Sequence, residues 1–137
     1  MREVVDVRCD LADLALARNA IVDRAISWGV PVDPNVLALL VGEVVANAME
    51  HGRPPIVAIV DWDEHRLRVE VSDASAESPV RRTPSAGDAD GRGIWLVDRD
   101  ATAWGVEGRD HGKSVWFELR GAGTGARYPA GGLTARA

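Results

Sequence analysis

The chain has 137 residues, of which 46% are hydrophobic and 27% are charged, and its formal net charge is −5. This length and composition predict a single globular domain with one continuous core. The negative charge argues against a general nucleic-acid-binding protein, because neutralising phosphates requires a basic surface, although a local pocket with Mg²⁺ can still bind a nucleotide.

The predicted elements of the N-terminal half are one strand and two helices. Residues 3–8 are typical of a short strand. Apolar residues then recur at helical spacing over residues 10–29, which open on a candidate N-cap. The pair Asp33-Pro34 predicts the start of a second helix, which is expected to end at Gly52 before two prolines.

In the C-terminal half, the spacing of apolar residues changes to the two-residue period of β-strands. Residues 55–62 and 66–73 are β-rich runs separated by a polar turn, which predicts an antiparallel hairpin. Residues 74–92 have no apolar period and indicate a long surface loop; such loops are usually functional or disordered. A short helix is expected over 93–101, and a last hairpin over 102–120.

This order of elements predicts the fold class. Helices grouped on one face of a mostly antiparallel sheet make an α+β protein, a two-layer sandwich. The long loop at one end of the sandwich would be free to act as a lid. Residues 1–120 are expected to form this domain, and the Gly- and Ala-rich tail 121–137 is expected to be disordered.

A polar stripe crosses the second predicted helix. Glu43, Asn47 and His51 are spaced four residues apart, so they lie on one side of a helix, beside apolar positions. A buried ionised carboxylate is costly without a partner, so the stripe is more informative than three exposed polar residues. These positions alone leave two readings open, a solvated helix edge and a functional set of side chains.

Three further features could carry chemistry, and each has a purely structural alternative. Asp73 ends a valine-rich strand, where carboxylates also serve as turn formers. Gly91 and Gly93 directly precede an apolar helical turn, where backbone N–H groups and the helix dipole favour an anion. Ordinary loop-to-helix junctions use glycine as well. Lys113 and Ser114 open the final strand, where a hydroxyl could reach a pocket or simply follow a hairpin turn.

In this order and at these intervals the four features resemble the Bergerat-fold (GHKL) ATPases, the group of gyrase, Hsp90-type chaperones and histidine-kinase catalytic domains. Within the group, the chain most resembles small bacterial anti-sigma-factor serine/threonine kinases and their actinobacterial histidine-kinase-like relatives. The stretch EVVANAMEH fits the family's N box, VSDAS the start of its first glycine box, GRGIWLV the second, and GKSVWFEL the final strand. The resemblance runs from about residue 10 to residue 120.

The resemblance implies ATP and Mg²⁺ as cofactors, with roles for the residues of the stripe. Asn47 would bind the Mg²⁺ that bridges the ATP phosphates, as a hard oxygen ligand suited to this ion. Glu43 would act as general base on the hydroxyl of a protein substrate, or orient a water. His51 is expected to be a packing or capping residue at the helix end.

The resemblance also implies which residues bind the rest of the nucleotide. Asp73 would accept a hydrogen bond from the adenine amino group, and Ser114 would support the adenine end of the site. Gly91, Arg92 and Gly93 would hold the phosphates. Phosphoryl transfer requires mainly positioning and charge neutralisation, so this small set of groups is sufficient in kind.

The first glycine box departs from the family pattern D-x-G-x-G. Ser75 and Glu77 stand where the glycines belong. Side chains at these positions reduce the freedom to adopt positive φ, and Glu77 adds negative charge near a polyphosphate. Arg81, Arg82 and Arg92 are candidates to offset that charge.

The resemblance further implies protein partners. The transfer target would be a serine or threonine of a STAS-type anti-sigma antagonist, and a sigma factor would be the second partner. No direct contact with nucleic acid and no membrane association are expected, while a homodimer fits the habits of the family. The charged N-terminus lacks the apolar core of a signal peptide, and no apolar run approaches about 18 residues, so a cytoplasmic protein is expected.

Two functional hypotheses follow. The leading one is an ATP-binding serine/threonine kinase that phosphorylates an anti-sigma antagonist in a partner-switching system. The alternative is a partner-switching binding module with weak or no kinase activity. The altered first glycine box favours the alternative, whereas the intact pair of Glu43 and Asn47 favours the kinase.

Overall fold

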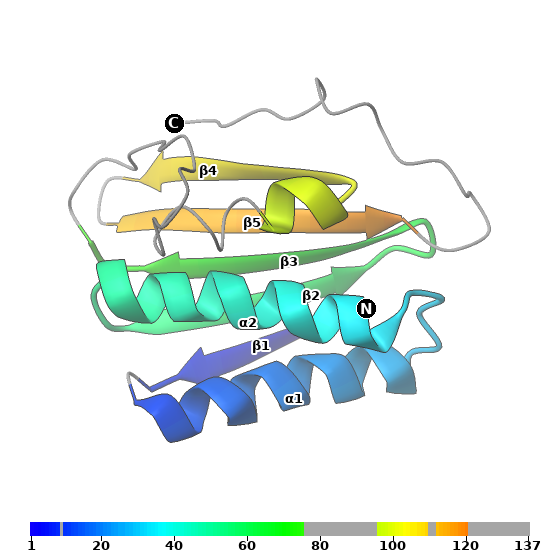
Figure 1. Cartoon of the computed structure of the whole chain (residues 1–137), viewed down its shortest axis with the longest axis horizontal. Helices are drawn as coiled ribbons and strands as arrows, with labels where there is room; N and C mark the ends of the chain where they lie inside the picture. The colour runs from blue at the N-terminus through cyan, green and yellow to red at the C-terminus, as the bar shows by residue number, and fades with distance from the viewer. Residues whose placement is uncertain (9, 76–95, 110–111, 121–137) are drawn as a thin grey trace.

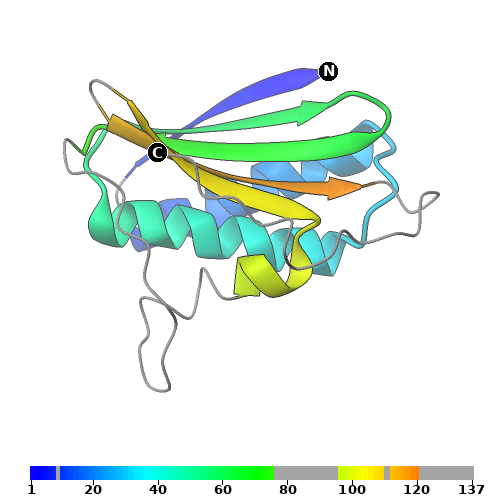
Figure 2. The same ribbon diagram turned by 90° about the horizontal axis from the view of Figure 1, so that it is seen from above.

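Five strands form one sheet, and two long helices cover one of its faces (Figures 1 and 2). The computed structural model describes residues 1–8, 10–75, 96–109 and 112–120. Its elements are β1 (Arg2–Val7), α1 (Leu11–Ser27), α2 (Pro34–His51), β2 (Ile56–Trp62), β3 (Arg66–Asp73), a helical turn over 96–100, β4 (Ala103–Arg109) and β5 (Gly112–Arg120). The strand order is β1-β2-β3-β5-β4, and all neighbouring strands are antiparallel. The predicted α+β sandwich is confirmed.

The core lies between the sheet and the helices. Along β3, Leu67, Val69 and Val71 are buried on the helix-facing side, and the residues between them are partly exposed on the other side. Phe117 of β5 is fully buried and pairs with Val69 in the sheet. Helix α2 adds the buried residues Leu37, Leu40, Val41, Val44, Val45 and Ala48. Helix α2 packs its buried side against the middle of the sheet. This contact sets the direction in which the polar flank of the helix faces.

Local signals explain where α2 begins. Asp33 is the N-cap in an extended conformation, and its carboxylate accepts a hydrogen bond from the Asn35 backbone N–H at 2.8 Å. Pro34 occupies the first turn, where the missing N–H is not needed.

Over the described residues, neither this helix nor α1 has the length and hydropathy needed to cross a bilayer.

Replacing Asp33 by alanine should lower the free energy of unfolding by about 1 kcal/mol, the usual loss when a helix N-cap is removed. The expected readout is a lower midpoint of urea unfolding with an unchanged slope. Asp23→Ala is the matched control, because Asp23 is an exposed carboxylate in the middle of α1. Equal midpoints for the two variants would show that the cap contributes nothing.

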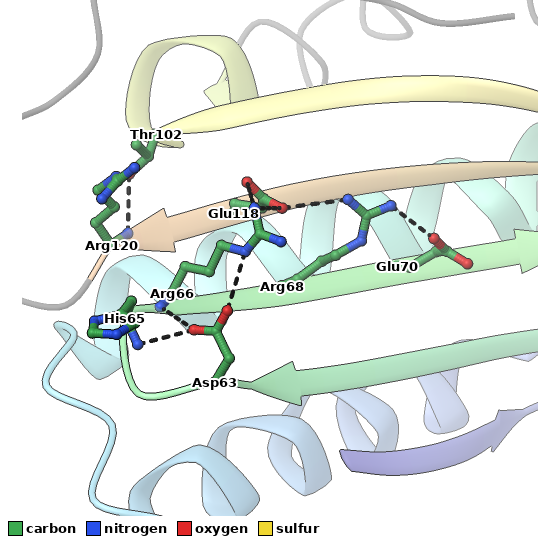
Figure 3. Close-up of polar contacts among 8 residues, drawn as sticks. All are labelled: Asp63, His65, Arg66, Arg68, Glu70, Thr102, Glu118 and Arg120. Atoms are coloured by element: carbon green, nitrogen blue, oxygen red, sulfur yellow. Dashed lines mark hydrogen bonds and ion pairs between the residues drawn. The ribbon is translucent and has the colours of Figure 1, made fainter. Parts of the chain in front are cut away.

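The sheet face away from the helices carries charged side chains (Figure 3). In the β2–β3 turn, Asp63 Oδ1 accepts hydrogen bonds from the backbone N–H groups of Arg66 and His65, at 2.8 and 2.9 Å. These bonds hold the pKa of Asp63 below its ordinary range. The stabilisation is therefore present above the unfolded-state pKa and is lost as the pH falls through the lowered one. Arg66 and Arg68 both reach Glu118, at 3.2 and 3.4 Å.

Candidate functional site

One flank of α2 carries the first candidate side chains. Gly42 marks the flank that faces α1, because a Cβ there would lie 3.8 Å from Arg18 Cδ. At about 100° per residue, Glu43 and Asn47 lie on the flank turned away from α1. Figure 1 shows that β3 and β5 lie on that side of α2. The two side chains therefore lie on the flank of α2 that is turned away from the helix pair.

Glu43 and Asn47 are half-buried and have no polar partner among the described residues. Neither side chain forms a hydrogen bond or ion pair with the described part of the chain. Removing a polar group from water without a partner is unfavourable, so these groups are suited to a ligand that supplies one. His51 differs, since it is exposed and its Nε2 lies 3.6 Å from Glu50 Oε2. The polar stripe thus consists of two half-buried members and one exposed member.

Asp73 is buried at the end of β3, on the helix-facing side of the sheet. Its Oδ1 accepts hydrogen bonds from the backbone N–H groups of Ser75 at 2.7 Å and Arg53 at 3.4 Å. Its Oδ2 accepts none from the described residues. The carboxylate is therefore held by one oxygen, and the other remains available as an acceptor.

The C-terminal end of α2 meets the end of β3. The Ala74 N–H donates a hydrogen bond of 2.8 Å to the carbonyl of Arg53, and Gly52, the C-cap of α2, lies against the Asp73 carboxylate. Asn47 precedes Gly52 by five residues, or about 7.5 Å along the helix axis. Glu43 and Asn47 therefore share one flank of α2, and Asp73 lies at the C-terminal end of the same helix.

Ser114 is not brought to Asp73. It pairs with Ser72, whereas Lys113 pairs with Asp73, and directly paired residues share a sheet face. Ser114 is fully buried on the face away from the helices, and its Oγ has no hydrogen-bond partner in the described part of the chain. Lys113 instead shares the helix-facing side with Asp73 and Phe117. Successive side chains of a strand point to opposite sheet faces, so Lys113, four residues before the apolar Phe117, could have been assigned to the face of Phe117 from the sequence.

The serine in the first glycine box fits its position. Ser75 is buried, and its backbone N–H closes a turn on the Asp73 side chain. Glu64 is the only described non-glycine residue with a positive φ, so Ser75 does not occupy the left-handed region. Serine in place of glycine therefore does not force residue 75 into an unfavourable backbone conformation. Glu77, Arg81 and Arg82 lie outside the described residues.

The predicted phosphate-binding residues Gly91, Arg92 and Gly93 lie outside the described residues, as does the tail 121–137. The described chain resumes at the helical turn over 96–100. In this turn Val97 is buried, and Asp98 Oδ1 accepts a hydrogen bond of 3.2 Å from Trp104 Nε1. These contacts attach the turn to β4.

The side chains present fit a nucleotide-bound Mg²⁺. Among the described residues no group of three or more His, Cys, Asp or Glu side chains could hold a metal ion. A cation at Asn47 would therefore take its other ligands from phosphate oxygens and waters, as Mg²⁺ commonly does. The amide of Asn47, which no described residue engages, offers an oxygen ligand to such an ion.

The chain was compared with known proteins. The family model described as histidine kinase-like ATPase domain matches residues 7–119. The matched range begins at the end of β1, ends in β5, and includes Glu43, Asn47 and Asp73. A search of the curated proteins gives no match.

Proposed function

The chain belongs to the histidine kinase-like ATPase domain family, and we propose that it is an anti-sigma-factor serine/threonine kinase of a partner-switching system. Family membership supports an ATP-binding regulatory domain. The observation that carries the finer proposal is the pair of half-buried side chains Glu43 and Asn47 on one flank of α2, neither of which has a polar partner among the described residues. A pure binding site for ATP has no need of an unpaired carboxylate next to the metal ligand.

In the proposed complex each end of ATP has its own set of residues. The Asn47 amide oxygen holds Mg²⁺, and Gly91, Arg92 and Gly93 contact the phosphates. Asp73 accepts a hydrogen bond from the adenine amino group through Oδ2, because Oδ1 is already bonded to the backbone. Bound Mg²⁺ supplies charge neutralisation on the phosphate oxygens.

Glu43 is proposed as the general base for phosphoryl transfer. The oxygen of a serine or threonine hydroxyl forms a bond to the γ-phosphorus, and the bond to the bridging β–γ oxygen breaks, leaving ADP. The hydroxyl proton passes to the Glu43 carboxylate. A carboxylate that no described residue engages is suited to receive it.

The proposed partners follow from the same assignment. The acceptor hydroxyl lies on another protein, for which we propose a STAS-type anti-sigma antagonist. The second partner is a sigma factor, which the protein would release or retain according to the phosphorylation state of the antagonist. A cytoplasmic location and a homodimer complete this proposal.

A second function is favoured by the first glycine box. Ser75 is only 3% exposed beside Asp73, so it occupies space that the family leaves to glycine. This favours a partner-switching module that binds the nucleotide and transfers phosphate slowly or not at all.

A transfer assay separates the two functions. The whole chain is incubated with Mg²⁺ and γ-labelled ATP, together with STAS-type proteins from the same genome. The kinase proposal predicts label on a serine or threonine of one of these proteins. Nucleotide binding and complex formation without label would support the binding module and contradict the kinase.

A further inference from the structure

The C-cap glycine of α2 lies where no side chain fits. A Cβ on Gly52 would lie 2.5 Å from Asp73 Cγ and 2.6 Å from both Asp73 Oδ2 and the Ala48 carbonyl oxygen. Such distances are not tolerated without a shift of the neighbours. The φ of Gly52 is −94°, which any residue can adopt. Glycine is therefore required here by space and not by backbone torsion.

A second glycine confines Asp73 from the other side. A Cβ on Gly112, the first residue of β5, would collide with the Asp73 carbonyl oxygen. The main chain of Asp73 thus lies against Gly112, and its side chain lies against Gly52. Asp73 is 7% exposed, and its Oδ1 is bonded to two backbone N–H groups. The carboxylate has little room to move away from an added methyl group.

The available oxygen of Asp73 is among the atoms that a side chain at position 52 would displace. Oδ2 lies in the path of the Cβ, and it is the oxygen that no described residue engages. Glu43 and Asn47 lie at least one turn earlier on α2, and the three atoms nearest to the added methyl group belong to Asp73 and Ala48. A change at Gly52 should therefore displace the base-binding acceptor and leave the phosphate end of the site intact.

We propose that Gly52 is a positioning residue for base recognition, which allows Asp73 Oδ2 to face the exocyclic amino group of adenine. This inference rests on the proposed assignment of Asp73 to the adenine end. It adds a specificity role for a residue that does not itself touch the nucleotide. It also ties base selection to α2, the helix that carries the proposed metal ligand and general base.

The test compares two nucleotides that differ at the position Asp73 would read. ITP has a carbonyl oxygen where ATP has the amino group, so it offers no hydrogen to a carboxylate at that exocyclic position. We expect the wild-type chain to prefer Mg²⁺-ATP over Mg²⁺-ITP by about 10- to 100-fold, the range of one buried charge-assisted hydrogen bond. Asp73→Asn sets the ratio expected when the acceptor is lost.

Gly52→Ala should lower the ATP-to-ITP affinity ratio to that of Asp73→Asn, while the affinity for ITP changes by less than about twofold. Gly42→Ala is the matched control, because a Cβ there meets only Arg18 Cδ, at an ordinary 3.8 Å. It should keep the wild-type ratio. An unchanged ATP-to-ITP affinity ratio in Gly52→Ala, or an equal loss of affinity for both nucleotides, would overturn the inference. Failure of the wild type to prefer ATP would overturn the adenine assignment itself, and the inference with it.

If Gly52→Ala folds too poorly for the binding assay, thermal unfolding provides a second test. Truncating the carboxylate in Gly52→Ala/Asp73→Ala removes part of the collision, so the loss of melting temperature caused by Gly52→Ala should be smaller in this background. A loss of the same size in both backgrounds would show that Gly52 and Asp73 are not coupled, which contradicts the inference.

Discussion

Asn47→Ala should reduce the affinity for Mg²⁺-ATP by at least about 100-fold. Loss of a group that merely supports a metal ligand costs about 10- to 100-fold in metal affinity, and Asn47 is proposed as the ligand itself. Its half-buried amide has no polar partner among the described residues, so its removal breaks no hydrogen bond within the described fold. Equilibrium dialysis with labelled ATP, with and without Mg²⁺, measures the effect.

Two controls accompany the Asn47 variant. Asn19→Ala removes an exposed amide from α1 and should leave ATP affinity unchanged. Asn47→Asp restores an oxygen ligand and should recover much of the binding. Retention of wild-type affinity by Asn47→Ala would place the metal elsewhere and remove the role assigned to this flank of α2.

Glu43→Gln should separate binding from chemistry. The substitution keeps the size of the side chain but removes its ability to take a proton, so phosphoryl transfer should fall by about 10²- to 10⁴-fold. ATP affinity should stay within about twofold, because Glu43 is not assigned to the nucleotide. The readout is the rate of labelling of the STAS-type acceptor under saturating ATP.

Glu50→Gln is the control for this experiment, since Glu50 is an exposed carboxylate on the same helix. It should transfer phosphate at the wild-type rate. Equal rates for Glu43→Gln and the wild type would exclude Glu43 as the base and favour a base supplied by the acceptor protein.

Much of the fold follows from local signals in the sequence. Asp33 and Pro34 predict the start of α2 correctly, and alternation along residues 66–73 predicts β3. The pairing of β3 with β5 is different, because 38 residues lie between these strands and no hairpin turn joins them. Such long-range pairing is decided by tertiary packing.

The candidate site was predictable in part. The four-residue spacing gave the shared flank of Glu43 and Asn47, because helix geometry fixes it. The spacing could not show that His51 is exposed, since burial depends on where the helix ends relative to the sheet. Ser114 was assigned by its place in a motif, although strand alternation puts Lys113 on the face of Asp73. The contact of Gly52 with Asp73 joins residues 21 positions apart and had no local signal.

The most direct test of the account is a calorimetric titration of ATP into the whole wild-type chain, in the presence of Mg²⁺ and then with Mg²⁺ chelated. We expect saturable binding of ATP in the presence of Mg²⁺ and a large loss of affinity for ATP when Mg²⁺ is chelated. Absence of saturable binding in the presence of Mg²⁺ would contradict the assignment of Asn47, Glu43 and Asp73 to a nucleotide site.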